Sequence, residues 1–327
     1  MEKIRWGILS TGNIATRFVS DLLEVEDAEV TAVASRSQDT ADLFGNQFGI
    51  RKRYGRYEDL IADESIDVIY IGTPHPFHKE NALACLRAGK AVLCEKPIAL
   101  NFNDAIEMRN AAFENQVFFM EAMWSRFIPA TEKVLEIINE GLLGEIRLLR
   151  ADFGYNAEFN PASRIYSPDL AGGALLDVGI YPITLAHLIL GMPETILSQV
   201  TKAETGVDAA NSMIFQYENG AMAMLYSAIN THTTVDAEIM GSRGLIRIHR
   251  RWHHSQRLTL VIDGEKRETI EIPYAGNGYR YEAMEVNRCL REGKLESPKR
   301  PIRASLEVLK IMDQLRQSWG LVYPQEL

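Results

Sequence analysis

Residues 1 to about 121 alternate short apolar, often β-branched runs with segments whose apolar residues recur at helical spacing. Ile14, Phe18 and Leu22 recur every four residues, as expected for one apolar helix face. The predicted strands of this half are 4–9, 29–35, 67–72, 91–94 and 117–121. Strands that alternate with helices favour βαβ units and a parallel sheet. We therefore predict a doubly wound α/β domain over residues 1–121.

The pattern changes after residue 127. Residues 129–139 have helical spacing, 145–153 read as a strand, and a loop rich in Pro, Ser and Gly extends to residue 173. Two hairpins are predicted, at Glu218-Asn219-Gly220 and at Asp263-Gly264, because each turn separates two apolar runs. Helices over 281–291 and 303–319 close the chain. We predict an α+β domain with an antiparallel or mixed sheet over residues 122–327.

Composition and charge narrow the possible functions. The chain has 327 residues, 46% of them hydrophobic and 24% charged, as expected for two globular domains. A formal net charge of −9 works against a nucleic-acid partner. No uninterrupted run of 18 apolar residues is present, so we expect no membrane partner. Three cysteines without a C-x-x-C pair and an N-terminus without a signal-peptide pattern predict a cytoplasmic location.

The first predicted strand leads into a tight turn that opens a helix. The dinucleotide fingerprint G-x-G-x-x-G/A falls on Ser10, Gly12 and Ala15, with serine in the first glycine position. Gly12 lets the backbone approach a pyrophosphate, and the helix start offers unpaired N–H donors. The candidate cofactor-binding residues of this turn are Ser10, Thr11, Gly12, Asn13 and Ile14. Taken alone, the pattern fits an ordinary strand-to-helix turn equally well.

The end of the second strand bears on the choice between NAD and NADP. An NAD-binding domain carries an acidic residue about 20 residues beyond the glycine turn, where this chain reads Ala34-Ser35-Arg36-Ser37. Without a carboxylate, a 2′-phosphate is not repelled, and Arg36 can bind it through its guanidinium, with Ser35 alongside. We therefore expect NADP, with NAD the less favoured cofactor. The alternative is a solvated loop arginine.

Two further strand ends carry polar groups to the same predicted sheet edge, where doubly wound sheets bind ligands. Thr73-Pro74 is followed by His75 and His78, and the next strand ends in Glu95-Lys96-Pro97. The candidates added here are Thr73, Pro74, His78, Glu95 and Lys96. The histidine spacing lacks the residues that would complete a metal site, so we expect no metal.

The second half contains the run Gly172-Gly173-Ala174-Leu175-Leu176-Asp177-Val178-Gly179-Ile180-Tyr181-Pro182. A helix here would place Asp177 and Tyr181 on one face. Pro182 must then lie in a first helical turn or kink the helix. On spacing alone, a core helix with a buried tyrosine is the commoner explanation.

These motifs, in this order and spacing, resemble the Gfo/Idh/MocA oxidoreductases (glucose-fructose oxidoreductase, inositol dehydrogenase and MocA) over essentially the whole chain. Residues 121–127, 151–154 and 177–182 are similar to the dihydrodiol dehydrogenase and NADP-dependent D-xylose dehydrogenase branch. The resemblance implies an NADP-binding Rossmann domain over 1–121. It also implies a substrate-binding and dimerisation domain over 122–327, whose large, mostly antiparallel open sheet often forms a homodimer interface.

The resemblance further implies hydride transfer between nicotinamide and a hydroxyl-bearing carbon of a sugar, polyol or trans-diol. Tyr181 is then the general acid/base, Lys96 stabilises its phenolate, and Asp177 holds substrate hydroxyls or positions Lys96. Arg126 is expected near cofactor or substrate. Trp124, Phe153 and Trp252 are candidates for an apolar wall against the substrate, with a core role for Trp252 equally open.

The alternative function is a non-catalytic NADP(H)-binding sensor or regulator with the same fold. Cofactor binding alone does not require the pair Lys96 and Tyr181, so the presence of both residues favours the enzyme.

Overall fold

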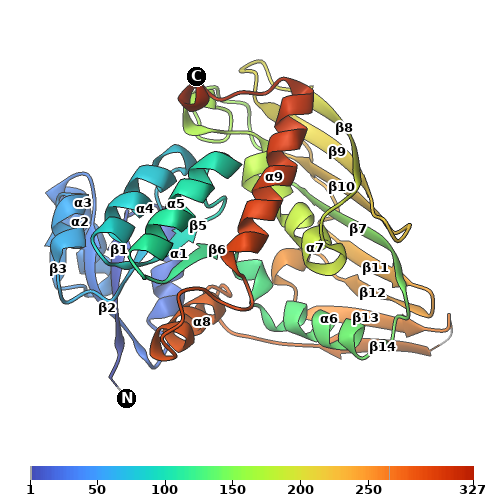
Figure 1. Cartoon of the computed structure of the whole chain (residues 1–327), viewed down its shortest axis with the longest axis horizontal. Helices are drawn as coiled ribbons and strands as arrows, with labels where there is room; N and C mark the ends of the chain where they lie inside the picture. The colour runs from blue at the N-terminus through green and yellow to red at the C-terminus, as the bar shows by residue number, and fades with distance from the viewer. Residues whose placement is uncertain (1, 265) are drawn as a thin grey trace. The chain divides into compact units, whose positions relative to one another are not determined.

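The computed structural model describes residues 2–264 and 266–327, which form two compact units (Figure 1). The first comprises the chain up to Phe127 together with Ala275–Leu306, and the second comprises Ile128–Tyr274 together with Glu307–Leu327. From the sequence, one boundary is predicted near residue 122, with everything beyond it in the second domain. The structure differs for residues 275–306, because this segment packs on the first unit.

The first unit contains a parallel sheet, whose strand order β3-β2-β1-β4-β5-β6 confirms the predicted doubly wound domain. Its strands are β1 (Ile4–Leu9), β2 (Ala28–Ala34), β3 (Lys52–Tyr54), β4 (Val68–Ile71), β5 (Ala91–Glu95) and β6 (Phe119–Ala122). Strand β3 and the helix α3 (Tyr57–Ala62) were not predicted, because elements this short show no clear period.

The remaining helices of this unit are α1 (Asn13–Leu22), α2 (Gln38–Phe48), α4 (His78–Arg87), α5 (Phe102–Glu114) and α8 (Arg280–Arg291). Phe18, which the sequence places on the apolar face of α1, stacks on Tyr70 of β4 with ring centroids 3.8 Å apart. Trp6 of β1 donates from Nε1 to Asn287 Oδ1 of α8 at 3.1 Å. Asp21 accepts from the backbone N–H of Asn277 and, at 2.8 Å, from that of Tyr279. These contacts hold the 275–306 segment on the sheet.

The second unit contains a larger sheet with the order β14-β13-β12-β11-β7-β10-β9-β8. Its described neighbours pair antiparallel except β7 and β10, which confirms the predicted mixed sheet. Both predicted hairpins form, although residue 265 of the second turn lies outside the described residues. The strands are β7 (Ile146–Gly154), β8 (Thr195–Lys202), β9 (Asp208–Gln216), β10 (Met222–Ala228), β11 (Ala237–Gly241), β12 (Gly244–Ile248), β13 (Arg257–Ile262) and β14 (Lys266–Glu271).

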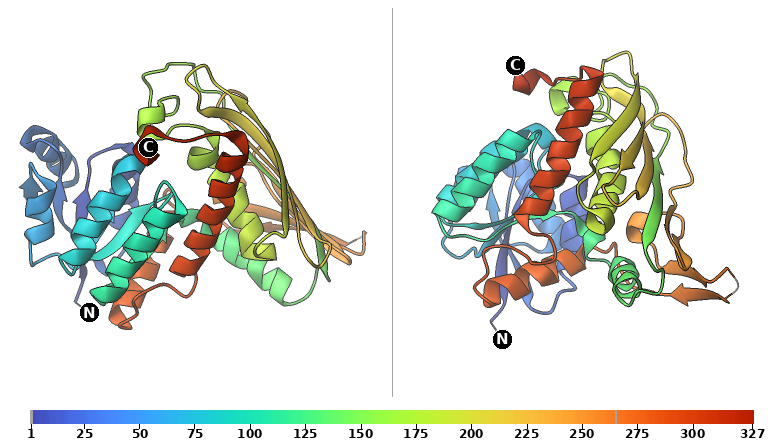
Figure 2. Two further views of the ribbon diagram at one scale, coloured as in Figure 1. Left: turned by 45° about the horizontal axis from the view of Figure 1, so that its top comes forward. Right: turned by 45° about the vertical axis from the view of Figure 1, so that its right-hand side comes forward.

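Helices α6 (Pro129–Asn139) and α7 (Ile180–Leu190) lie on one face of this sheet (Figure 2). Helix α9 (Ile302–Trp319) closes the chain, and its residues from Glu307 onward belong to this unit. The segment Pro168–Leu190 is long and apolar enough to cross a membrane by length and composition alone. Its most apolar window is 72% buried inside the protein, as in the core helix of a globular unit.

Candidate functional site

The turn after β1 has its backbone in the conformation that a fingerprint glycine would adopt. Ser10 stands in the first glycine position and has φ of +104°, in a region that favours glycine. Its buried hydroxyl donates to the Gly72 carbonyl at 2.8 Å, which ties the turn to the end of β4. The serine therefore keeps the fingerprint turn and adds a hydrogen bond that glycine could not make.

The N-terminus of α1 is open to an anion. Gly12 is the N-cap residue and makes no side-chain cap, and the first turn contains no acidic residue. A Cβ added at Gly12 would meet only Ser10 Oγ within 4 Å, at 3.7 Å, so the backbone here is approachable from outside. Asn13 is exposed and Ile14 half-buried at the start of the helix. This arrangement fits a pyrophosphate bound to helix N–H groups.

A cluster of hydroxyl groups lies where β2 leads into α2. Thr11 Oγ1 is 3.1 Å from Ser35 Oγ, and Thr40 Oγ1 donates to Ser35 Oγ at 2.6 Å. Ser37 caps α2 by accepting from the Thr40 N–H at 3.4 Å. Arg36 is exposed beside this cluster in the chain. Ser37 and Thr40 were not predicted, although the N-cap pattern after the strand could have indicated them.

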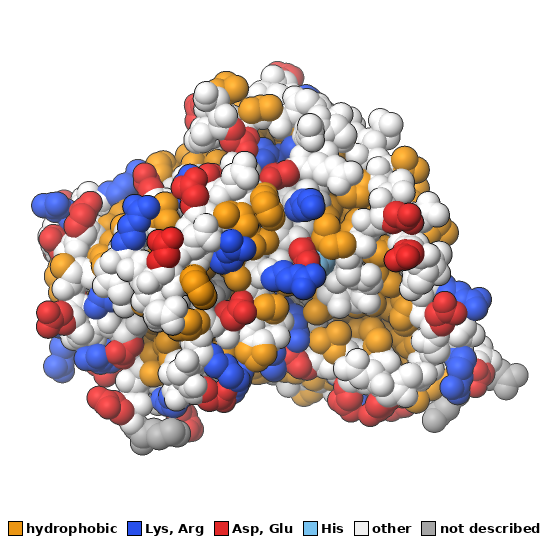
Figure 3. Space-filling view, in the orientation of Figure 1, with side chains coloured by type: hydrophobic (Ala, Val, Ile, Leu, Met, Phe, Trp, Pro, Cys, Tyr) orange, Lys and Arg blue, Asp and Glu red, His pale blue; other side chains and the backbone are white. Residues whose placement is uncertain are grey.

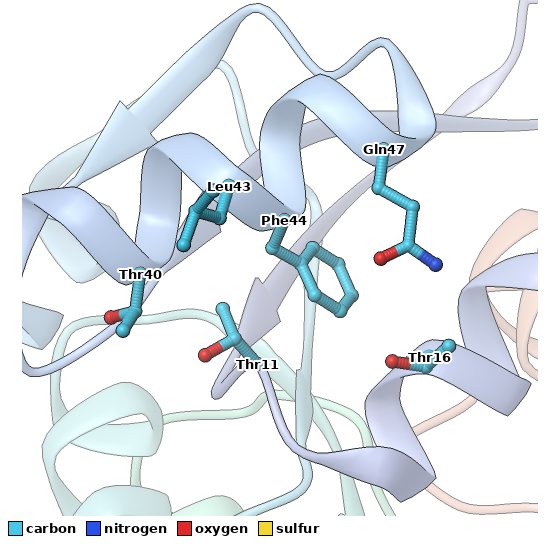
Figure 4. Close-up of a pocket in the computed structure, with 6 residues that line it drawn as sticks. All are labelled: Thr11, Thr16, Thr40, Leu43, Phe44 and Gln47. Carbon is cyan, nitrogen blue, oxygen red and sulfur yellow. The ribbon is translucent and has the colours of Figure 1, made fainter.

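A pocket of about 370 Å³ opens next to these hydroxyls. The side chains of α2 point across it toward the first turn and α1 (Figure 4). It is lined by Thr11, Thr16, Thr40, Leu43, Phe44 and Gln47. The first unit thus combines a helix N-terminus, a hydroxyl cluster and a mixed polar and apolar pocket.

His78 connects two loops at the carboxyl edge of the sheet. It is fully buried as the first residue of α4, with Nδ1 2.8 Å from the Pro97 carbonyl and Nε2 2.8 Å from the Thr73 carbonyl. Burial lowers the pKa of His78, and the two carbonyls act in the opposite direction. Because both ring nitrogens face backbone carbonyls, His78 positions these loops; Thr73 is buried and Pro74 exposed between them.

Glu95 and Lys96 follow at the end of β5. Glu95 is buried, accepts from the Tyr70 hydroxyl at 2.7 Å and accepts from the Lys96 backbone N–H at 3.2 Å. Burial raises the pKa of the Glu95 carboxyl, against the Tyr70 hydrogen bond and the Lys96 charge. Glu95 therefore holds the backbone that carries Lys96, whose side chain is half-buried.

Trp124 and Arg126 both belong to the first unit, beyond the boundary predicted at residue 122. The Trp124 ring lies 4.8 Å from that of Tyr279, and Arg126 Nε donates to the Lys299 carbonyl at 3.0 Å. The 275–306 segment thus orients both side chains, a contact that no local spacing could indicate.

In the second unit, Asp177 lies in a π-helical turn, Leu175–Gly179, that leads into α7. Pro182 falls in the first turn of α7, one of the two predicted placements. Asp177 Oδ1 is 2.9 Å from Arg164 Nη2, and Oδ2 accepts from the Tyr155 hydroxyl at 2.9 Å. Arg164 and Tyr155 were not predicted, because the loop that joins them to Asp177 has no periodic pattern.

Tyr181 lies in an aromatic cluster. Its ring is 5.3 Å from Phe153 and 5.4 Å from His253, which themselves stack at 4.2 Å and 15°. His253 was not among the predicted site residues, and residues 252–254 form a short 3-10 turn. Trp252 is buried and donates from Nε1 to the Asp152 carbonyl at 2.8 Å, which favours its core role.

The remaining observations concern metal binding and the grouping of predicted residues within each unit. Within residues 2–264 and 266–327, no group of three or more His, Cys, Asp or Glu is arranged to hold a metal ion. The structure brings Ser10, Thr11 and Ser35 together in the first unit, and Phe153 and Tyr181 in the second.

Comparison with known proteins gives matches over most of the chain. Residues 4–123 match the model of the oxidoreductase family with an NAD-binding Rossmann fold, and residues 131–247 match the GFO/IDH/MocA C-terminal domain. Trans-1,2-dihydrobenzene-1,2-diol dehydrogenase from Mus musculus is 38% identical over 335 residues, which cover 99% of both chains. The Homo sapiens protein of the same name is 37% identical with the same coverage.

Solved structures agree with these matches. The 3-ketoreductase KijD10 from Actinomadura kijaniata, in complex with NADP and TDP-benzene, has a TM-score of 0.87 and 26% identity, covering 97% of this chain and 98% of that one. Aldose-aldose oxidoreductase from Caulobacter crescentus has a TM-score of 0.88, covering 97% of each chain. Its identity of 23% means that this second likeness shows the fold alone.

Proposed function

This chain belongs to the Gfo/Idh/MocA oxidoreductase family, and on that premise we propose that it is an NADP-dependent dehydrogenase acting on CH–OH groups. The observation that carries the proposal is the first unit's open helix N-terminus, followed by Arg36 among hydroxyl groups in place of an acidic residue. The best-supported substrates are trans-diols, sugars and polyols.

The residues of the first unit fit NADP. Backbone N–H groups at the start of α1, such as that of Asn13, would hold the pyrophosphate, because the N-cap residue Gly12 supplies no side-chain cap. The Gly12 N–H itself donates to Ser10 Oγ at 3.4 Å. Arg36 would hold the 2′-phosphate through a charge-assisted pair, with hydroxyl donors from Ser35 and Thr40. The bound cofactor supplies a hydride acceptor or donor.

The second unit supplies the acid/base group. Tyr181 takes up the proton of the substrate hydroxyl in the oxidative direction and returns it in the reductive one. Asp177 accepts hydrogen bonds from substrate hydroxyls while Arg164 and Tyr155 hold its carboxylate in one orientation. The family resemblance assigns Lys96 the role of stabilising the Tyr181 phenolate by positive charge.

The polar and aromatic groups around Tyr181 favour a substrate that combines a ring with hydroxyl groups. Phe153 and His253 give a flat, partly apolar surface next to Tyr181, which suits an aromatic or alicyclic ring. Asp177 and Arg164 supply polar contacts for hydroxyl groups. A trans-diol combines both features, in agreement with the substrate named for the relatives at 37–38% identity.

The cofactor proposal is tested by fluorescence titration with NADPH and NADH. We expect tighter binding of NADPH, and Arg36→Ala should weaken NADPH binding about 10- to 100-fold because a charged hydrogen bond is worth about 1.5–3 kcal/mol. NADH binding should be unchanged. Arg87→Ala, which removes an exposed arginine from the last turn of α4, is the matched control. Equal loss for both cofactors would contradict the role of Arg36.

The chemistry is tested by turnover of trans-1,2-dihydrobenzene-1,2-diol, aldoses and polyols. Tyr181→Phe should abolish most turnover and leave NADPH binding intact, because only a proton-transfer group is lost. Tyr217→Phe is the control, since its buried hydroxyl has no hydrogen-bond partner among the described residues. Tight NADPH binding without turnover of any class would favour the sensor function instead.

We also propose that the chain is a homodimer that pairs through the outer face of its large sheet. Exposed apolar side chains gather there from three adjacent strands, in pairs such as Leu197 with Ile214 and Ile214 with Met224. Met224→Lys should shift the mass in light scattering from dimer to monomer. Met284→Lys, on the exposed face of α8, should not. A wild-type monomer would refute the proposal.

For the cell, we propose a cytoplasmic location and no nucleic-acid or membrane partner. Cys85, Cys94 and Cys289 are buried thiols without disulfides, which suits a reducing compartment. Acidic and basic side chains are interspersed on the face shown in Figure 3 rather than gathered into one basic patch. Cell fractionation with an antibody to the chain tests the location.

A further inference from the structure

A buried chain of hydrogen bonds lies under the π-helical turn that carries Asp177. Asp208 Oδ2 accepts from the Leu175 backbone N–H at 2.7 Å and from Asn211 Nδ2 at 2.8 Å. Asn211 Oδ1 in turn accepts from Ser227 Oγ at 2.9 Å. Asp208 and Asn211 belong to β9 and Ser227 to β10, so two strands of the large sheet reach the start of the turn.

The backbone of the turn lies directly against these polar groups. Asp208 has no exposed surface, and Ser227 is 1% exposed. Gly173 has φ of +117°, and a Cβ there would lie 2.2 Å from Asp208 Oδ1. A Cβ at Gly179 would lie 2.7 Å from Ser227 Oγ. Glycine at both ends of the turn is therefore what permits this close approach.

Asp208 satisfies a backbone donor that the helix itself leaves unpaired. N–H groups in the first turn of a helix have no acceptor within it, and π-helical turns are rare and often mark functional sites. Burial raises the pKa of Asp208 to about 7, against hydrogen bonds from Leu175 and Asn211. Its Oδ1 has no hydrogen-bond partner among the described residues. Burying a carboxyl costs more free energy than burying an apolar residue, and at Asp208 the hydrogen bonds from Leu175 and Asn211 offset part of that cost.

We propose that Asp208 is a positioning residue for catalysis: through the Leu175 N–H it fixes the π-helical turn, and with it the orientation of Asp177 and Tyr181. The inference rests on the proposed function for the role of Tyr181. It assigns a role to a fully buried side chain that no sequence motif indicated.

Three variants of the full chain test this proposal. Asp208→Ala removes the acceptor, Asp208→Asn retains an acceptor oxygen of the same size, and Phe215→Leu disturbs the buried core from the same strand without touching the network. Turnover is measured with NADP⁺ and trans-1,2-dihydrobenzene-1,2-diol, alongside NADPH affinity and thermal stability. Asp208→Ala should lower kcat about 10- to 100-fold, as expected for misplaced reacting groups, without weakening NADPH binding.

The conservative variant and the core variant separate positioning from plain stability. Asp208→Asn should recover most of kcat, and Phe215→Leu should keep kcat even where it lowers the melting temperature as much as Asp208→Ala does. If Phe215→Leu loses kcat in parallel with its stability, or if Asp208→Asn is no better than Asp208→Ala, the positioning role is refuted.

Hydrogen–deuterium exchange gives a readout that does not depend on turnover. Asp208→Ala should accelerate exchange in residues 173–181 relative to wild type, with Phe215→Leu as the comparison. Unchanged exchange in this segment would overturn the inference, even if the wild-type protein fails to oxidise the diol. Failure of the wild-type protein to bind NADPH would instead refute the proposed function, which keeps the two failures distinguishable.

Discussion

The buried ion pair between Glu121 and Arg300 gives a prediction whose magnitude follows from the structure. Glu121 lies near the carboxyl end of β6, and its side chain is 1% exposed. Arg300 lies in the segment 275–306, and its side chain is 3% exposed. Glu121 Oε2 accepts from Arg300 Nε at 3.2 Å and from Ser305 Oγ at 2.7 Å, while Oε1 accepts from the Ile98 N–H at 3.0 Å. One carboxylate thus joins the discontinuous segment to the loop after Lys96.

Replacing Glu121 by Leu leaves the Arg300 guanidinium buried without a counter-charge. Breaking a buried pair in this way costs about 3–5 kcal/mol, whereas replacing both partners by apolar residues is often close to neutral. We therefore expect Glu121→Leu to lower the stability of the first unit by about 4 kcal/mol. The double variant Glu121→Leu/Arg300→Leu should be more stable than this single variant.

The assay is hydrogen exchange at increasing urea concentration, read by mass spectrometry in peptides that cover residues 98–121 and 297–305. Reading these peptides separates the first unit from the second, so that the two unfolding transitions are not averaged. Two results would refute the reasoning: a loss of less than about 1 kcal/mol in Glu121→Leu, or a double variant as unstable as the sum of the two singles.

Three further predictions concern thiols, pH and the attachment of residues 275–306. Burial raises the pKa of the thiols of Cys85, Cys94 and Cys289. A thiol reagent at pH 8 should therefore label the native protein far more slowly than the urea-unfolded chain. Fast labelling of the native protein would contradict this. Asp208 has a folded pKa of about 7, above its unfolded value, so the stability it contributes is present at low pH and is lost as pH rises toward 7. Asp208→Asn should flatten the decline in the free energy of unfolding, measured in urea, between pH 4 and pH 7 by at most about 1.4 kcal/mol per pH unit. An unchanged slope would count against the raised pKa. Asp21→Ala leaves the backbone N–H groups of residues 277 and 279 without their acceptor. The free energy of unfolding in urea should fall by about 3 kcal/mol. A fall below about 0.5 kcal/mol would show that water replaces the carboxylate.

Much of the fold could be predicted because its signals are local. The helix over 129–139 forms with those bounds, and the hairpin at Glu218-Asn219-Gly220 forms between β9 and β10. Both depend on residues within a few positions of one another, so spacing and turn chemistry suffice. The turn at Ser10 was also recognised, although its serine departs from the glycine pattern; the positive φ explains why the fold tolerates it.

The site could be predicted only in part. Ser35 lies beside Thr11, and Phe153 lies beside Tyr181, while their roles toward cofactor and substrate stay predictions. His253 was not predicted, because two adjacent histidines carry no periodic signal and its contact with Tyr181 depends on a turn more than 70 positions along the chain. Arg164 and Tyr155 were missed for the same reason, since a loop brings them to Asp177.

The sequence by itself determined the βαβ order of the first half, the fingerprint turn, the absence of an acid at the ribose position and the family. These properties reside in neighbouring residues and in the spacing of short motifs. Only the tertiary structure decided that residues 275–306 complete the first unit, that Asp177 lies in a π-helical turn, and that Asp208 supports that turn from β9. The physical reason is that buried polar groups must find partners, and the folded backbone decides which distant residues supply them.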